Sequence, residues 1–162
     1  MVQSHSGALI VTLQSDTEIK FERVFEAPRT LVFEAFSKPE HIKRWWGLRA
    51  YTLVVCEMDF RPGGSWRFVE RAPDGTEHPF KGEYREISPP ERIVQTFIYN
   101  VAPFDSESVE TVTFTEKDGR TTLTAVARYD SRETRDAVAE SGMEVGAAES
   151  YDRLSELLAE LA

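Results

Sequence analysis

The first periodic segment of the chain alternates apolar and polar side chains. Ile19, Phe21 and Phe25 fall on one face of a two-residue period, and Lys20 and Glu22 fall on the other. This alternation predicts a half-buried strand over residues 19–25.

Two short helices are predicted to follow this strand. Pro28 suits the first turn of a helix, and apolar side chains crowd residues 31–36 directly after it. Ser37 and Glu40 have the spacing of a capping box, which predicts a second helix that runs through Trp45. Gly47 then ends the helix pair.

Six runs of β-branched and aromatic residues occupy the middle of the chain, separated by turn sequences rich in Pro, Asp and Gly. The connections are too short to hold crossover helices, so the predicted sheet is largely antiparallel. The Asp118-Gly119 pair between two such runs is the strongest hairpin signal. The predicted strands cover residues 51–58, 65–71, 78–87, 92–100, 108–117 and 120–129.

Helical spacing of apolar residues returns at the C-terminal end. Asp130 with Glu133 predicts an N-terminal cap and one continuous helix over residues 131–161. Gly142 and Gly146 weaken the middle of this helix by about 1 kcal/mol each relative to alanine. Among the predicted elements, this helix alone is long enough to cover the apolar face of the sheet. Its predicted buried stripe consists of Met143, Ala147, Tyr151, Leu154, Leu158 and Leu161.

The chain of 162 residues and 18.4 kDa is long enough for one domain with a sizeable core. We expect an N-terminal segment over residues 1–16 and a single domain over residues 17–162. Ala8, Ile10 and Leu13 in the first segment could form an edge strand, either within the chain or across a homodimer. The pattern does not distinguish these two arrangements.

Charge and cysteine content narrow the possible partners and the compartment. The formal net charge of −9 argues against binding to nucleic acids or to anionic membrane surfaces. Cys56 is the single cysteine, so no intrachain disulfide can form. No apolar run approaches the roughly 20 residues of a membrane helix, and the run from Ala8 to Leu13 is too short for a signal sequence. These features predict a cytoplasmic protein with no membrane association.

The inner face of the predicted sheet is unusually rich in large rings, whereas the facing helix is slim around Gly146 and Ala147. The two surfaces either interdigitate tightly or enclose a cavity, and the sequence leaves both alternatives open. Glu70 and Glu110 share the inward parity of their strands. Each is either half-solvated at the rim of a cavity or an acid with a perturbed pKa, and we favour the rim.

Motifs for chemistry are missing from the sequence. It contains no glycine-rich phosphate loop and no nucleophile elbow. His5, His41 and His78 are far apart and lack metal-ligand spacing, and Cys56 is interpreted as a small apolar side chain. We therefore predict no catalytic residue, no metal and no cofactor.

An ordered series of short motifs resembles the AHSA family, whose members are similar to the C-terminal domain of the activator of the Hsp90 ATPase. That family belongs to the START-like or SRPBCC superfamily. The resemblance implies an α+β helix-grip fold: a strand, two short helices, a six-strand antiparallel sheet and a long C-terminal helix over the curved sheet. It also implies a deep hydrophobic pocket. The motifs include Phe25-Glu-Ala-Pro28, Arg44-Trp45-Trp46-Gly47, Arg61-Pro-Gly-Gly64 and Gly82-x-Tyr84-x-x-Ile87.

Three functions are compatible with the resemblance. The preferred one is noncatalytic binding of an apolar or amphipathic small molecule between the sheet and the C-terminal helix. The alternatives are a chaperone-ATPase co-regulator in the stress response, which would have a chaperone partner, and an enzyme of the cyclase, aromatase or hydrolase type. Many relatives carry an aromatic residue where this chain has Ala147. The predicted cavity lining is Trp45, Trp66, Phe68, Phe80, Tyr84, Phe97, Tyr99, Val112, Phe114, Met143, Ala147 and Tyr151.

Overall fold

The computed structural model describes residues 8–101 and 105–162, which form one curved antiparallel sheet and four helices. The strands are β1 (Ile10–Ser15), β2 (Glu18–Phe25), β3 (Thr52–Met58), β4 (Ser65–Arg71), β5 (Glu77–Ser88), β6 (Arg92–Tyr99), β7 (Ser108–Lys117) and β8 (Arg120–Arg128). The helices are α1 (Arg29–Ser37), α2 (Pro39–Trp45), α3 (Arg132–Glu140) and α4 (Met143–Leu161).

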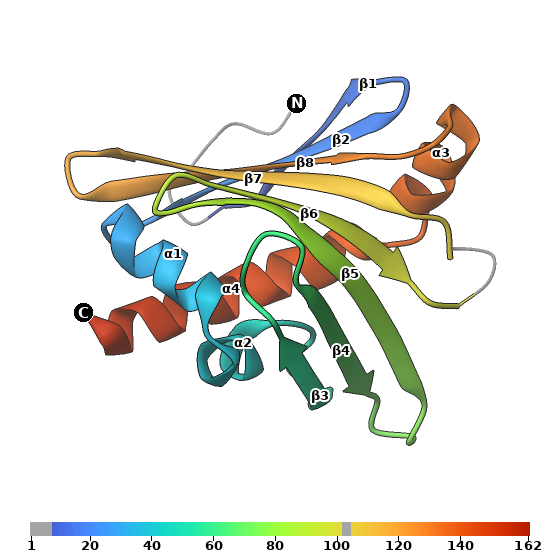
Figure 1. The fold of residues 1–162 in the computed structure, drawn as a ribbon, viewed down its shortest axis with the longest axis horizontal. Coiled ribbons are helices and arrows are strands. Elements are labelled where there is room, and N and C mark those ends of the chain that lie inside the picture. The colour runs from blue at the N-terminus through green and yellow to red at the C-terminus, as the bar shows by residue number, and fades with distance from the viewer. Residues whose placement is uncertain (1–7, 102–104) are drawn as a thin grey trace.

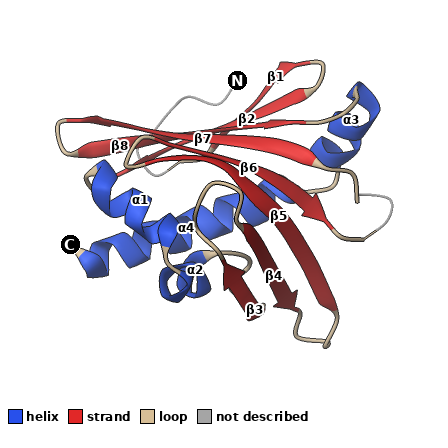
Figure 2. Cartoon of the chain, viewed as in Figure 1, coloured by secondary structure: helices blue, strands red, loops and turns tan. Residues whose placement is uncertain are grey.

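The sheet has the order β1-β2-β8-β7-β6-β5-β4-β3, and each neighbouring pair is antiparallel. It bends so that β3 to β5 swing away from the plane of β7 and β8, and α1, α2 and α4 lie within the bend (Figure 1). Figure 2 shows that these three helices gather on the same side of the sheet. The predicted helix-grip α+β fold is confirmed.

The sheet is wider than the six strands predicted, because β2 and β1 extend it on one side. β2 pairs along its whole length with β8, as expected for a segment that alternates buried and half-buried residues. β1 pairs with β2 of the same chain, from Ile10 opposite Glu22 to Ser15 opposite Glu18. The hydrophobic N-terminal run therefore forms an edge strand within the chain, and Leu13 on it remains 54% exposed.

The helix pair begins as the sequence predicts, although the capping box does not form. α1 follows Pro28, and α2 carries Pro39 in its first turn. The residue at the N-cap of α2 is Lys38, which makes no side-chain capping bond. Ser37 instead donates its hydroxyl hydrogen to the Glu34 carbonyl at 2.9 Å, because it is still the last residue of α1.

The prediction of one unbroken C-terminal helix is wrong. α3 ends at Glu140 and α4 begins at Met143, with Gly142 between them at a φ of +84°, a left-handed conformation that side chains disfavour. The N-cap is Ser131 rather than Asp130, since the Ser131 hydroxyl accepts the Thr134 N–H at 3.1 Å. The break lets α3 lie at the end of the sheet while α4 crosses its concave face (Figure 1).

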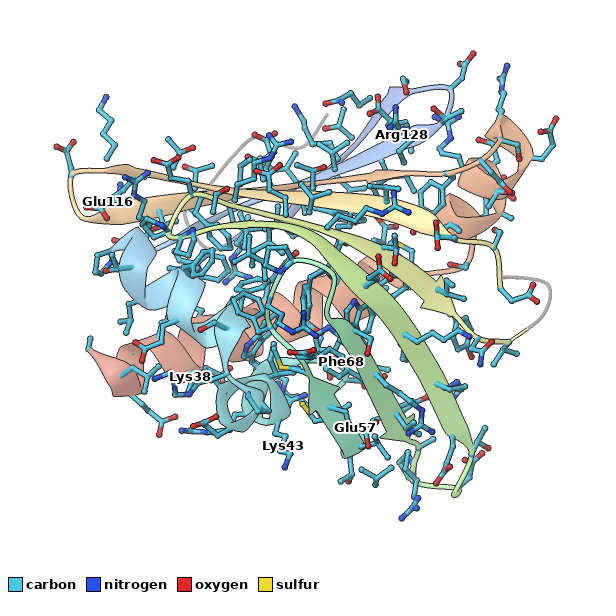
Figure 3. All side chains as sticks on the ribbon, viewed as in Figure 1. Lys38, Lys43, Glu57, Phe68, Glu116 and Arg128 are labelled. Atoms are coloured by element: carbon cyan, nitrogen blue, oxygen red, sulfur yellow. The ribbon has the colours of Figure 1, made fainter. Side chains whose placement is uncertain are left out.

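The core fills the space between the concave face and the helices. From α4 it takes Leu154, Leu157 and Leu158, all buried. Figure 3 labels Phe68 in the middle of the molecule, between β4 and the helices, whereas Lys43 and Glu57 lie at its outer edge. The N-terminal half of α4 contributes smaller side chains, and this difference positions the site.

Candidate ligand-binding cavity

A cavity of about 590 Å³ lies between the sheet and the N-terminal half of α4. Its volume falls in the range of about 300–1,000 Å³ that is typical of small-molecule sites. All but two of the predicted lining residues border it: Trp45, Trp66, Phe68, Phe80, Tyr84, Phe97, Tyr99, Met143, Ala147 and Tyr151.

Val112 and Phe114 are the two predicted lining residues that do not border the cavity. Both point inward and are buried, as their parity on β7 predicts. Phe114, however, packs under α1, with its ring 5.4 Å from that of Phe33 and 5.3 Å from that of Phe36. The side chains of α1 fill the space there, so this end of β7 belongs to the closed core.

The cavity walls are aromatic, and their rings make edge-to-face and tilted contacts. The ring of Trp46 lies 5.1 Å from that of Phe68 and 4.9 Å from that of Phe80. The Trp66 ring lies 4.8 Å from Phe68 and 5.7 Å from Phe97. These contacts hold the rings in fixed orientations without filling the space in front of them.

Trp45, the last residue of α2, and Trp46, the C-cap of this helix, both border the cavity. Trp45 is buried, and its indole N–H donates to the Ala35 carbonyl at 3.0 Å, which orients the ring. Trp46, which was not among the predicted lining residues, borders the cavity beside it. The change from helical backbone at Trp45 to extended backbone at Trp46 brings both side chains to the cavity, and this change could not be read from the sequence pattern.

The helix side of the cavity is open because α4 is slim there. A methyl group at Gly146 would approach only Leu48, at 3.9 Å, among atoms within 4 Å. Ala147 borders the cavity one position further along. Val145 also borders it and is 64% exposed, so the cavity reaches the surface near the junction of α3 and α4.

A polar clamp holds the loop after α2 against the sheet and α4. Glu70 is buried, and its Oε2 accepts the Leu48 N–H at 2.9 Å. Gly47 has a φ of +94°, and a Cβ there would lie 1.8 Å from that same oxygen. Arg153 donates to the Gly47 carbonyl at 2.9 Å, and the Ser150 hydroxyl accepts the Gly47 N–H at 2.9 Å. Burial raises the pKa of Glu70, and the Leu48 hydrogen bond opposes this shift.

A second carboxyl lies inside the cavity. Glu110 borders it, and the Gln95 amide donates to Glu110 Oε1 at 3.2 Å from the next strand. Burial raises the pKa of the Glu110 carboxyl to about 7. Both alternatives for this residue therefore apply in part, because Glu110 is half-buried beside the cavity and its pKa is raised.

Polar lining residues were largely missed from the sequence. Gln95 lies directly opposite Glu110, a pairing that follows from the β6–β7 register rather than from any local pattern. The other hydroxyl groups that were missed come from loops, from the ends of elements and from α4. They are Ser106, Ser108, Tyr129, Thr134, Ser141 and Ser150.

Other candidate chemistry is sparse in the part of the chain that the structure describes. No group of three or more His, Cys, Asp or Glu side chains could hold a metal ion there. Burial raises the pKa of the Cys56 thiol to about 11, so it is a poor nucleophile near neutral pH. The Nδ1 atom of His78 lies 2.7 Å from the Tyr99 hydroxyl.

No helix among the described residues has the length and apolarity to cross a bilayer. His5 lies outside the described residues.

The curved sheet, the crossing helix and the enclosed aromatic cavity define a helix-grip domain of the START-like or SRPBCC class. The family model for activator of Hsp90 ATPase homolog 1-like proteins matches residues 26–159. The chain belongs to this family, and the resemblance drawn from its sequence motifs is confirmed.

Solved structures agree with this assignment. A protein from Rhodobacter sphaeroides is 27% identical, with a TM-score of 0.87 over 96% of this chain and 100% of its own. Protein Ms6760 from Mycobacterium smegmatis is 26% identical, with a TM-score of 0.83 over 93% of this chain and 97% of its own. The search of curated proteins gave no match.

Proposed function

We propose that the protein binds an apolar or amphipathic small molecule, without catalysis, in the cavity between the sheet and α4. The observation that carries the proposal is the cavity of about 590 Å³, which is walled by fixed aromatic rings and bordered by the slim stretch at Gly146 and Ala147. Apolar surface left facing such a space favours an apolar occupant by roughly 25 cal/mol per Å² covered.

Among the described residues, no imidazole or second carboxyl is hydrogen-bonded to Glu110 as a partner for proton transfer. Glu110 has an amide partner, Gln95, which neither gives nor takes a proton. Tyr129 and Tyr151 interact with Glu110, but burial raises the pKa of both, so they stay protonated. We therefore assign no catalytic residue. We further propose a cytoplasmic location, in keeping with the single cysteine of the sequence.

The decisive experiment fills the cavity from the helix side. We expect the wild-type protein to take up the neutral fluorescent probe N-phenylnaphthylamine, and Ala147→Trp to weaken that uptake by at least about tenfold, equal to 1.4 kcal/mol. The melting temperature of Ala147→Trp is expected to stay the same or rise, because the ring enters empty volume. Ala159→Trp, the same substitution at an exposed position of α4, is the matched control.

A close-packed interior would give the opposite result. Ala147→Trp would then lose about 1–3 kcal/mol of stability by overpacking, and the wild type would bind no probe. That outcome would refute cavity binding and favour the chaperone alternative, in which the protein acts through surface contacts.

A further inference from the structure

Glu110 is placed where a ligand would meet it. It lies on β7 between Gln95 of β6 and Ala127 of β8, its direct cross-strand neighbours. Ala127 is small and leaves one side of the carboxyl without a bulky neighbour. Glu110 borders the cavity and accepts a hydrogen bond from Gln95 at Oε1. An ionised carboxylate has about four acceptor sites, so it keeps the capacity to bind a donor group of a ligand.

No cation compensates this carboxylate among the described residues. Arg23 on β2 points inward, but it pairs with Asp152 at 2.8 Å. Arg135 on α3 is buried and donates to the Ser15 carbonyl and to Asp136. Burial and the Gln95 hydrogen bond are accordingly the influences on the Glu110 pKa.

The other titratable side chains that border the cavity are neutral or acidic, so none of them supplies a positive charge. Tyr129, just after β8, and Tyr151 on α4 have pKa values raised by burial and by the charge of Glu110, so both remain neutral donors. Glu70 on β4 borders the same cavity, with Oε2 bonded to Leu48 N–H. His78 on β5 is engaged with the Tyr99 hydroxyl.

The walls around the carboxyl are suited to a cation. Trp66, Phe97 and Tyr151 border the cavity together with Glu110. The faces of aromatic rings attract ammonium groups, most strongly where water is excluded. An ammonium group would also supply the charge partner that a buried carboxylate lacks, whereas a hydroxyl would supply a hydrogen bond alone and an anion would be repelled.

We propose that the cavity selects an apolar amine: a ligand with an aromatic or alicyclic body and one ammonium group that pairs with Glu110. The inference rests on the proposed function, since it requires that the cavity admit a small molecule. It adds the chemical class of that molecule and the residue that recognises it.

The test compares two probes of equal shape, naphthylmethylamine and naphthylmethanol, by titration calorimetry. We expect wild-type protein at about pH 8 to bind the amine at least about tenfold more tightly than the alcohol, a difference of 1.4 kcal/mol. Glu110→Gln keeps the size of the side chain and should reduce the preference to within about threefold. Glu144→Gln, at an exposed position of α4, removes the same charge outside the cavity and should leave the preference unchanged.

The pH profile of the wild type supplies a test that needs no variant. Lowering the pH from about 8 to about 6 protonates a carboxyl with a pKa of about 7 and should weaken amine binding by about tenfold, while the amine itself stays charged. Tighter binding of the alcohol than of the amine would overturn the inference, as would an amine preference that survives in Glu110→Gln. Either result leaves small-molecule binding standing. If neither probe nor N-phenylnaphthylamine binds, small-molecule binding is refuted as well.

Discussion

The concave face of the sheet has two regions that carry similar side chains but are covered differently. Near α1, the rings of Phe33 and Phe36 pack edge-to-face on Phe114 of β7, which is buried and does not border the cavity. Near the start of α4, Trp66 and Phe97 border the cavity, and the helix lines it with the small residues Gly146, Ala147 and Ser150 between Met143 and Tyr151. The comparison teaches that strand patterning makes an apolar face, and that the size of the covering side chains decides whether this face becomes a core or a pocket.

The largest effect is expected on removing the helix that covers both regions. A fragment that ends at Asp130 loses α3 and α4, including Leu154, Leu157 and Leu158, each of which stabilises the fold by roughly 1.5–3 kcal/mol through burial. We expect this fragment to aggregate or to lack a cooperative melting transition by circular dichroism. A soluble fragment with a sharp transition would show that the sheet buries its own concave face.

Removing one aromatic ring from each region should show a difference in how tightly the two regions are packed. Phe114→Ala is expected to cost about 3–5 kcal/mol, because a fully enclosed ring leaves a new cavity. Phe97→Ala should cost less than about 2 kcal/mol, since Phe97 is half-buried and already borders empty space. Urea unfolding of both variants measures the difference, and equal costs would mean that the cavity region is as tightly packed as the core.

The smallest effect concerns Glu110, one of the two carboxyls that border the cavity. The folded-state pKa of Glu110 is about 7, above its ordinary value of 4.5, so the folded state holds the proton to higher pH than the unfolded state does. The contribution of Glu110 to the stability of the wild type should therefore fall as pH rises from about 4.5 to about 7. Above that range, Glu110→Gln should be more stable than the wild type by up to about 3 kcal/mol, at 1.36 kcal/mol per pKa unit.

Urea unfolding at about pH 5 and about pH 8 tests this sign, with Glu144→Gln as the control for net charge. An unchanged difference between Glu110→Gln and the wild type at the two pH values would mean that water hydrates the carboxylate well in the empty cavity.

The sequence predicted the strands and their inward faces because a period of two is a local property. Phe68 and Phe114 were both placed on the inner face, and both are there. The sequence did not distinguish Phe68, which lines the cavity, from Phe114, which lies in the core. Only the position of α1 along β7 places Phe114 in the core. The break at Gly142 was missed for a related reason: glycine is tolerated within a helical pattern, and its positive φ follows from where α3 and α4 must lie.

The polar part of the site was the least accessible to sequence reasoning. Glu110 was recognised as inward-facing, but the bond from Gln95 depends on strand register, and the missing cation depends on Arg23 reaching Asp152 instead. Whether an inward-facing carboxylate gains a hydrogen bond or a cation depends on tertiary contacts between residues that are far apart in the sequence. A period can therefore indicate that an acid faces inward without indicating what its pKa will be.

The placement of the tryptophans has a spectroscopic consequence. The chain has three, Trp45, Trp46 and Trp66, and all of them border the cavity. Every indole that emits light in this protein therefore senses the same small volume, and no distant tryptophan adds a constant background. The wavelength and intensity of the intrinsic tryptophan fluorescence therefore report whether the cavity holds water, a bound ligand or a substituted side chain.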